Sequence, residues 1–341
     1  KQRNVNGSTI FAKVQQSLWK DINGGFTKAN IAKAIADANS ILYKLEYKKQ
    51  NILFNAKNAY WDLSYSREIV FFKKLSLSRT KKIMNLNQKK YNMGLIERSD
   101  LLQSQIAVKL RELNLKLAYE EENKSDRVFN QFLNFGDTVV AYEVEKLLNR
   151  KNNFRENKVL VKKVIRFDVL SALEDVKSAL FDHIAYKKNS CGDLLLRGHY
   201  ILNSVDKRIM TLDRPSYYVG AVYILPLDFR LRRTVNKGYE SAEIAARKFA
   251  DCAAVQEKVD WIQIVDNWRN ANERLSLVVE IESIERQRHL ENRFLFSKGR
   301  ITTYQILRSE QDMDDAILSV LQNILELLKI NNKAKTFYDA S

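Results

Sequence analysis

The sequence has few of the residues that break helices and form turns. Among 341 residues there are only 10 glycines and 2 prolines, well below average usage. Gly94 is the only glycine or proline between Gly25 and Gly136, and Gly299 is alone between Gly238 and the last residue. Because turns depend on these residues, we expect a few very long helices that reverse at Gly94 and Gly299.

Residue types that carry chemistry are scarce or scattered. Cys191 and Cys252 lie outside any CxxC or Cys/His cluster, so we interpret them as free or buried thiols and leave a disulfide open. The histidines, His183, His199 and His289, are dispersed, which argues against a zinc site or a triad. There is no glycine-rich phosphate loop and no nucleophile elbow. We therefore expect no enzyme activity, no metal and no cofactor.

The sequence also has no long apolar run, and its acidic residues are fewer than its basic ones. No run approaches the roughly 20 apolar residues of a membrane-spanning helix. The chain begins at Lys1 without a signal peptide, which we interpret as a trimmed or incomplete N-terminus. The 57 Lys+Arg residues outnumber 41 Asp+Glu and give a net charge of +16. A basic surface suits nucleic acid, anionic lipid or acidic partners, and charge alone does not choose among them.

The stretches without breakers carry a helical pattern. Residues 26–93 would form a helix about 100 Å long at about 1.5 Å per residue. Their apolar positions step by 4 and 3, as in a coiled-coil seam. These positions are Ile31, Ile35, Ala38, Leu42, Leu45, Ile52, Ala56, Ala59 and Leu63, and after Gly94 the pattern resumes at Leu102, Ile106, Leu110, Leu113 and Leu117, up to about Leu133. We expect this stripe to form the seam of a helical hairpin that turns at Gly94 in the left-handed conformation.

Residues 239–298 and 300–338 repeat the arrangement around Gly299. The corresponding stripe consists of Trp261, Ile264, Trp268, Ala271, Leu275 and Val278. The two tryptophans are interpreted as packing residues of a second hairpin.

Three stretches have the two-residue period of strands. They are 9–18, 194–203 and 216–227, and the last two, joined by the polar connection 204–215, form a plausible hairpin. A short helix is expected at 168–187.

The fold is therefore predicted to be mainly α with a small β part, and internally duplicated. We divide it into a first repeat at 1–136, an irregular insert at 137–166 and a second repeat at 167–341.

At this point the residues resemble a family, the TolC-like outer-membrane efflux proteins, over essentially the whole chain. YNMGLIERSDLLQSQ (91–105) and FLFSKGRITTYQILRSEQD (294–312), each midway through a hairpin, carry the resemblance. SLWKDINGG (17–25), YILPLDF (223–229) and NWRNANERL (267–275) support it.

The resemblance implies a homotrimeric outer-membrane channel. Each protomer would give four strands to a shared β-barrel and its long paired helices to a periplasmic tunnel, the α-barrel. Expected partners are outer-membrane lipid, a periplasmic membrane-fusion adaptor and an inner-membrane pump of RND or ABC type, in tripartite efflux or type I secretion. Only three strands are readable, and the family's N-terminal helix and first strand are missing, so we expect the N-terminal part to be absent.

The resemblance also assigns residues to the two tips and to a closed entrance beyond them. The adaptor-docking turns would be Met93, Gly94 and Leu95, and Lys298, Gly299 and Arg300. Asp100 keeps the acidic residue that relatives carry after the first tip, whereas Gln305 and Arg308 replace those after the second, which puts an acidic entrance in doubt. Arg98 and Arg300 could form ion pairs that hold the tips shut. The alternatives are plain helix caps for the glycines and a favourable helix N-terminal position for Asp100.

One other functional class stays open. A basic coiled-coil scaffold that binds nucleic acid or a membrane surface would explain the charge and the heptads. It does not need strands midway along the chain, and the clustered aromatic and arginine residues of a base-stacking surface are missing, so we expect no nucleic acid.

Tyr217, Tyr218 and Tyr223 are expected in an interfacial aromatic girdle, or else in a sheet that faces helices in a soluble protein.

Overall fold

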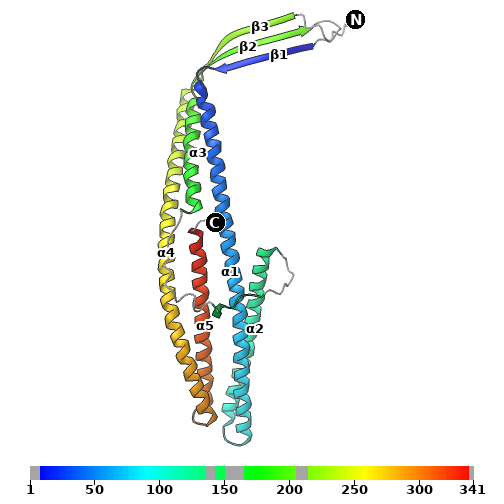
Figure 1. Cartoon of the computed structure of the whole chain (residues 1–341), viewed down its shortest axis with the longest axis vertical. Coiled ribbons are helices and arrows are strands. Elements are labelled where there is room, and N and C mark those ends of the chain that lie inside the picture. Colours follow the sequence, from blue (N-terminus) through cyan, green and yellow to red (C-terminus); the bar gives the residue numbers. More distant parts are fainter. Residues whose placement is uncertain (1–7, 135–142, 150–164, 205–213, 338–341) are drawn as a thin grey trace, which may run out of the picture. The chain divides into compact units, whose positions relative to one another are not determined.

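A computed structural model describes residues 8–134, 143–149, 165–204 and 214–337. The order of elements is β1 (Ser8–Ser17), α1 (Gly25–Asn92), α2 (Arg98–Leu133), α3 (Phe167–Asn189), β2 (Asp193–Ser204), β3 (Arg214–Ile224), α4 (Phe229–Ser297) and α5 (Thr303–Ala334) (Figure 1). Short 3-10 turns lie at Ile22–Gly24 and Lys335–Phe337. These elements confirm the predicted mainly α fold with its long helices and small β part. None of the described helices is long and apolar enough to cross a membrane.

The described chain divides into two compact units, and α1 and α4 each contribute to both. The first unit is Lys1–Tyr47 with Arg166–Glu257, and the second is Lys48–Ile165 with Lys258–Ser341. The three segments expected from the sequence were defined by the internal duplication, not by compact units. Their boundaries stay a prediction.

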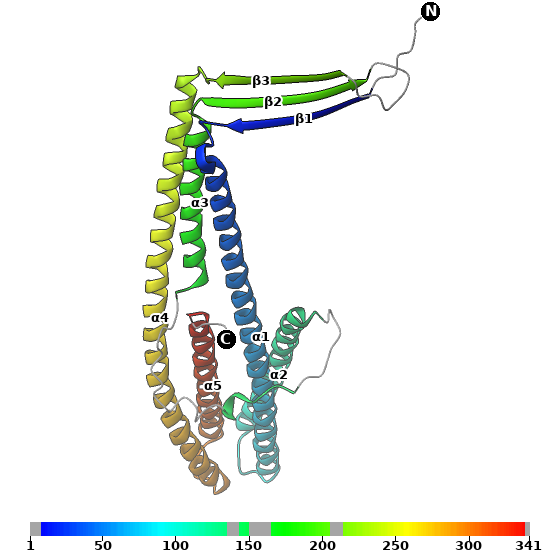
Figure 2. The ribbon, with the colours of Figure 1, turned by 45° about the horizontal axis from the view of Figure 1, so that its top comes forward.

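The first unit contains one antiparallel sheet in the order β1-β2-β3. In its register, His199 of β2 lies opposite Lys13 of β1 and Tyr218 of β3. The predicted β2–β3 hairpin is confirmed, although most of the connection 204–215 lies outside the described residues. Figure 2 shows that α1, α3 and α4 meet the sheet at one end of its strands.

Small and polar side chains join the helices of the first unit. Ala36 and Ser40 are buried on α1. The Ser40 hydroxyl donates to Asp175 Oδ1 of α3 at 2.6 Å, and Ser178 of α3 donates to Asp37 Oδ1 at 2.5 Å. These helices approach closely because little side-chain volume separates them.

The second unit has its main apolar core along α4 and α5. Buried members include Ala271, Leu275, Ile317, Leu321, Ile324, Leu327 and Leu328, and Trp268 and Val278 pack against them. Ile264 is buried in a neighbouring cluster, against which Trp261 packs. The predicted seam of the second hairpin, including the packing role of both tryptophans, is therefore confirmed.

The predicted seam of the first hairpin is wrong. Ile31, Ile35, Leu42, Leu45 and Ile52 are between 52% and 58% exposed. On α2 the stripe is also exposed, at Leu102, Ile106, Leu110, Leu113 and Leu117. Apart from Ala59 and Leu63, the buried positions of α1 are mostly other and smaller residues, among them Ala29, Ala36, Ser40, Ser66, Ser76 and Thr80. The helices that pack on α1 therefore contact mainly its small side chains, and the larger apolar stripe is left exposed among the described residues.

Part of the expected insert is described, and it is packed rather than loose. Leu147 is fully buried in the α4–α5 core. The Ser64 hydroxyl donates to the Glu145 carbonyl at 2.5 Å, and the Glu145 N–H donates to Tyr60 Oη at 2.9 Å. The remainder of 137–166, apart from residues 165 and 166, lies outside the described residues. Cys191 and Cys252 are free thiols.

Candidate functional site

The two predicted reversals have the same backbone geometry. Gly94 and Gly299 have φ values of 71° and 72°. At each tip the N–H of the residue after the glycine donates to the carbonyl oxygen five residues earlier, at 2.9 Å in both. This is the Schellman ending of a helix, which requires the left-handed conformation at the glycine. A Cβ built at either glycine meets nothing within 4 Å, so φ alone demands glycine there.

The side chains of the first tip (93–95) and the second tip (298–300) differ in chemistry. Met93 and Leu95 are 71% and 68% exposed. Lys298 and Arg300 flank the second glycine and are also exposed. One tip is therefore apolar and the other basic, although their backbones match.

Contacts that the sequence did not predict join the tips. Lys90 Nζ, near the end of α1, donates to the Phe296 carbonyl at 3.3 Å and lies 4.5 Å from the centroid of its ring. Asn87 Nδ2 donates to Thr303 Oγ1 at 3.1 Å, and an apolar cluster around Ile83 and Ile306 lies beside them. The two tips of the chain are thus held together by a cation–π contact, hydrogen bonds and apolar packing.

The expected latch of Arg98 and Arg300 is not formed within the chain. Neither arginine makes an ion pair with any residue that the structure describes. Both side chains are exposed, and exposed ion pairs contribute only about 0–1 kcal/mol.

The expected entrance residues follow the tips at the start of α2 and α5. Asp100 is half-buried in the first turn of α2, where a carboxylate is favoured by the helix dipole. Gln305 belongs to a capping box in which its Oε1 accepts from the Thr302 N–H at 2.9 Å and its own N–H donates to Thr302 Oγ1 at 3.2 Å. That bond explains Gln305 as a helix cap. Its placement at a gate, like that of Asp100, stays a prediction.

Arg308 is exposed but its charge is compensated locally. Its Nε lies 3.0 Å from Asp312 Oδ1, one turn along α5. Arg308 also lines a groove between α2 and α5 together with Ile106 and Leu110. Asp312 was not singled out from the sequence, and it also pairs with Arg288 of α4, whose Nη2 lies 2.5 Å from its Oδ2.

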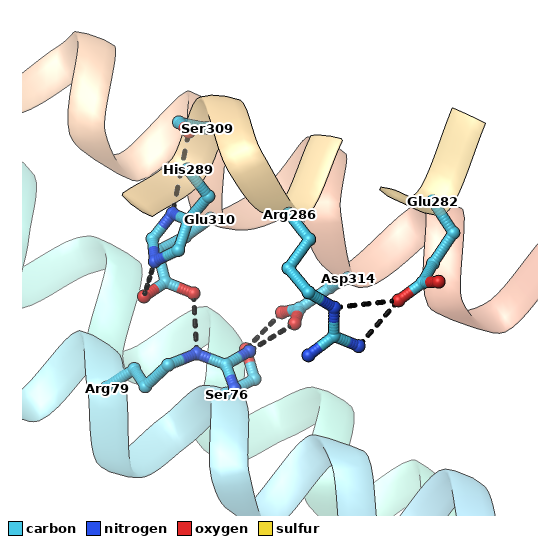
Figure 3. Close-up of polar contacts among 8 residues, drawn as sticks. All are labelled: Ser76, Arg79, Glu282, Arg286, His289, Ser309, Glu310 and Asp314. Carbon is cyan, nitrogen blue, oxygen red and sulfur yellow. Dashed lines mark hydrogen bonds and ion pairs between the residues drawn. The ribbon is translucent and has the colours of Figure 1, made fainter. Parts of the chain in front are cut away.

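A buried ionic cluster lies further along the helices (Figure 3), and we call Ser76, Arg79, His289, Glu310 and Asp314 the Arg79 cluster. Arg79 of α1 donates from Nε to Glu310 Oε2 at 2.7 Å and from Nη2 to Asp314 Oδ1. Ser76 also donates to Asp314. The two acidic side chains of α5 are 3% and 6% exposed. One guanidinium group of the first hairpin therefore holds two carboxylates of the second.

His289 of α4 completes this cluster. Its Nε2 lies 3.4 Å from Glu310 Oε1, and its Nδ1 lies 3.5 Å from Ser309 Oγ. Burial raises the pKa of the Glu310 carboxyl, and Arg79 opposes that effect. Burial, with the charges of Arg79 and Arg293, lowers the pKa of His289. Both shifts disfavour the charged form of the group, so the attraction within the cluster is centred on Arg79.

No protein-family model and no curated protein matches the sequence. Several solved structures match nearly all of the chain in shape, among them three outer-membrane channels. The outer-membrane channel OprN matches with a TM-score of 0.82 at 13% identity, over 98% of this chain and 80% of its own. The open state of the MtrE outer membrane channel of Neisseria gonorrhoeae gives 0.78 at 11% identity, over 98% and 79%. The CmeC outer membrane channel of Campylobacter jejuni gives 0.70 at 12% identity, over 98% and 77%.

The chain has a TolC-like fold. The resemblance recognised from the tip motifs is confirmed at the level of the fold, over 98% of the chain.

Proposed function

We propose that the protein is a protomer of an outer-membrane channel that exports substrates, with its helices in the periplasm. The observation that carries this proposal is the match in fold to outer-membrane channels over 98% of the chain. The strands support it, because β1, β2 and β3 have 10, 12 and 11 residues, close to the roughly 9–11 residues of a tilted membrane-spanning strand. Tyr217, Tyr218 and Tyr223 are exposed on β3, as an interfacial aromatic girdle would require.

The channel is proposed to be a homotrimer. Three or four strands leave backbone groups unpaired at both edges of a sheet, which lipid does not tolerate. Twelve strands from three protomers would close a barrel within the known range of sizes. The exposed stripes of α1 and α2 support the same assembly, because heptad-spaced Leu and Ile side chains are suited to a neighbouring protomer's helices.

The tips are proposed to dock a periplasmic adaptor, which would connect the channel to an inner-membrane pump. Met93, Gly94 and Leu95 would form the apolar half of this surface, and Lys298, Gly299 and Arg300 the basic half. Arg98, Asp100, Gln305 and Arg308 would line the entrance behind it. Opening would require the two hairpins to separate, and the Arg79 cluster is one set of contacts that such a movement must break.

Two measurements test the proposed function. The full-length protein should fractionate with outer membranes and, after reconstitution into planar bilayers, should conduct ions. A protein that stays soluble without detergent and gives no conductance would favour the basic scaffold instead.

A further inference from the structure

A group of basic side chains surrounds the place where the sheet of the first unit meets its helices. We call Lys20, Lys187, Lys188, Arg230, Arg232 and Arg233 the basic junction. They come from the turn after β1, the end of α3 and the start of α4. None of the six forms an ion pair with a carboxylate among the residues that the structure describes.

The carboxylates nearest to them in sequence are already engaged. Asp21 accepts from the N–H groups of Phe26 and Thr27 at 2.8 and 3.0 Å. Asp193 accepts from the Ser17 hydroxyl at 2.5 Å. Asp228 accepts from the Leu231 N–H at 2.9 Å. Because these carboxylates order the turns, they form no ion pair with the junction among the described residues. Three carboxylates offset only part of the charge of six cations.

The junction contains a hollow that suits a headgroup. Lys187 and Cys191 of the α3 end line it from one side, and Phe229, Arg232 and Arg233 of α4 line it from the other. Arg232 Nη2 lies 3.7 Å from Cys191 Sγ. That contact orients one edge of the guanidinium and leaves its other N–H donors for an oxygen acceptor.

Exposed apolar side chains alternate with these cations. Leu227, Phe229 and Leu231 are 75%, 60% and 59% exposed. The turn after β1 adds Trp19, which is 59% exposed. Tryptophan and basic residues together are typical of a membrane–water interface, whereas a site for a small soluble anion has no need of exposed leucines.

We propose that the basic junction binds the phosphate headgroups of anionic phospholipids while its apolar side chains enter the bilayer. This inference rests on the proposed function, because strands that span the membrane end here, at the periplasmic side. Charge-assisted bonds from Lys and Arg to phosphate are strong, and each basic residue near an anionic surface adds measurable attraction. The bound lipids would fix the height of the sheet in the bilayer.

Native mass spectrometry of the full-length protein in detergent tests this. The protein is mixed with equal amounts of phosphatidylglycerol and phosphatidylcholine that carry the same acyl chains. We expect at least a roughly tenfold preference for phosphatidylglycerol. The preference should fall towards one in the triple variant Lys187→Gln, Arg232→Gln, Arg233→Gln. The matched control Lys48→Gln, Lys116→Gln, Lys258→Gln removes the same charge from exposed helix positions and should keep the preference.

Other outcomes would overturn the proposal. An unchanged preference in the junction variant or an equal loss in the control would each do so. So would adducts of phosphate in place of lipid when inorganic phosphate is added to the same mixture. If the junction variant misfolds, the unaltered protein still tests the proposal. Its preference for phosphatidylglycerol must weaken when the concentration of ammonium acetate is raised, and a preference that does not depend on salt contradicts headgroup binding. Conductance without lipid preference refutes this inference alone, whereas a protein that never inserts refutes the proposed function as well.

Discussion

Replacing Arg79 with methionine should destabilise the second unit strongly. Methionine fills part of the space of the arginine stem but leaves Glu310 and Asp314 without their shared cation. Both acidic side chains are nearly inaccessible, at 3% and 6% exposure. Removing one partner of a buried ion pair costs about 3–5 kcal/mol. Because Arg79 itself is 24% exposed, solvent weakens its interaction, and we expect about 3 kcal/mol at pH 7.

The loss should also depend on pH with a defined sign. Burial already raises the pKa of Glu310 above its ordinary 4.5, and without Arg79 it rises further. A carboxyl whose pKa is raised by folding favours the folded state fully below its unfolded pKa and loses that contribution as the pH rises through the folded pKa. The difference between Arg79→Met and the unaltered protein should therefore be largest at pH 7–8 and shrink towards pH 5.

Urea denaturation in detergent, followed by circular dichroism at pH 5 and at pH 8, measures this difference in the free energy of unfolding. Arg274→Met is the matched control, because Arg274 pairs with Glu326 at 2.6 Å but both side chains are exposed. It should cost about 0–1 kcal/mol at either pH. If Arg79→Met cost no more than this control, or cost the same at pH 5 and pH 8, the cluster would not be a buried, charge-dependent contact.

The other predictions concern the tips, the entrance and the assembly. Gly94→Val and Gly299→Val should each strain a left-handed turn by about 1–2 kcal/mol and abolish export in a transport assay while trimers persist; normal export from both would contradict adaptor docking at the tips. In planar-bilayer reversal potentials under a salt gradient, Asp100→Asn should shift preference towards anions and Arg308→Asp towards cations, and no shift in either would place both residues outside the constriction. Leu110→Lys, on the exposed stripe of α2, should leave helical content unchanged but convert trimers to monomers by mass measurement; persistent trimers would exclude this stripe from the interface.

Local chemistry made the long elements predictable. The scarcity of glycine and the heptad spacing act within a few turns, so the helices, both reversals and the three strands could be found from the sequence. The capping box of Thr302 and Gln305 was also visible as a Thr-x-x-Gln pattern, although we interpreted Gln305 as a gate residue. The Thr-x-x-Gln pattern alone is enough to predict a helix cap at Gln305, without any comparison with relatives.

Partners across the fold could not be predicted. Periodicity identified Ile31 and Ile35 as apolar but could not say whether the same chain covers them. Nor could it pair Arg79 with Glu310, which lies 231 positions away, because no local pattern encodes which side of a long helix faces another hairpin. The sequence does contain a weak sign of a buried ionic contact, because Glu310 and Asp314 lie one turn apart on the apolar, buried face of α5.

The different seams of the two hairpins have a mechanical consequence. The side chains that α2 buries are Leu101, Ser104, Val108, Ala118 and Asn130, only one of them a large aliphatic residue. In contrast, α5 buries a continuous series of large aliphatic residues that includes Leu321, Ile324 and Leu327. Large interlocked side chains resist sliding because every displacement must lift them out of their holes, while small ones present a smoother surface. When a force acts on the helices, the α4–α5 pair should therefore resist relative sliding, and the α1–α2 pair should deform first.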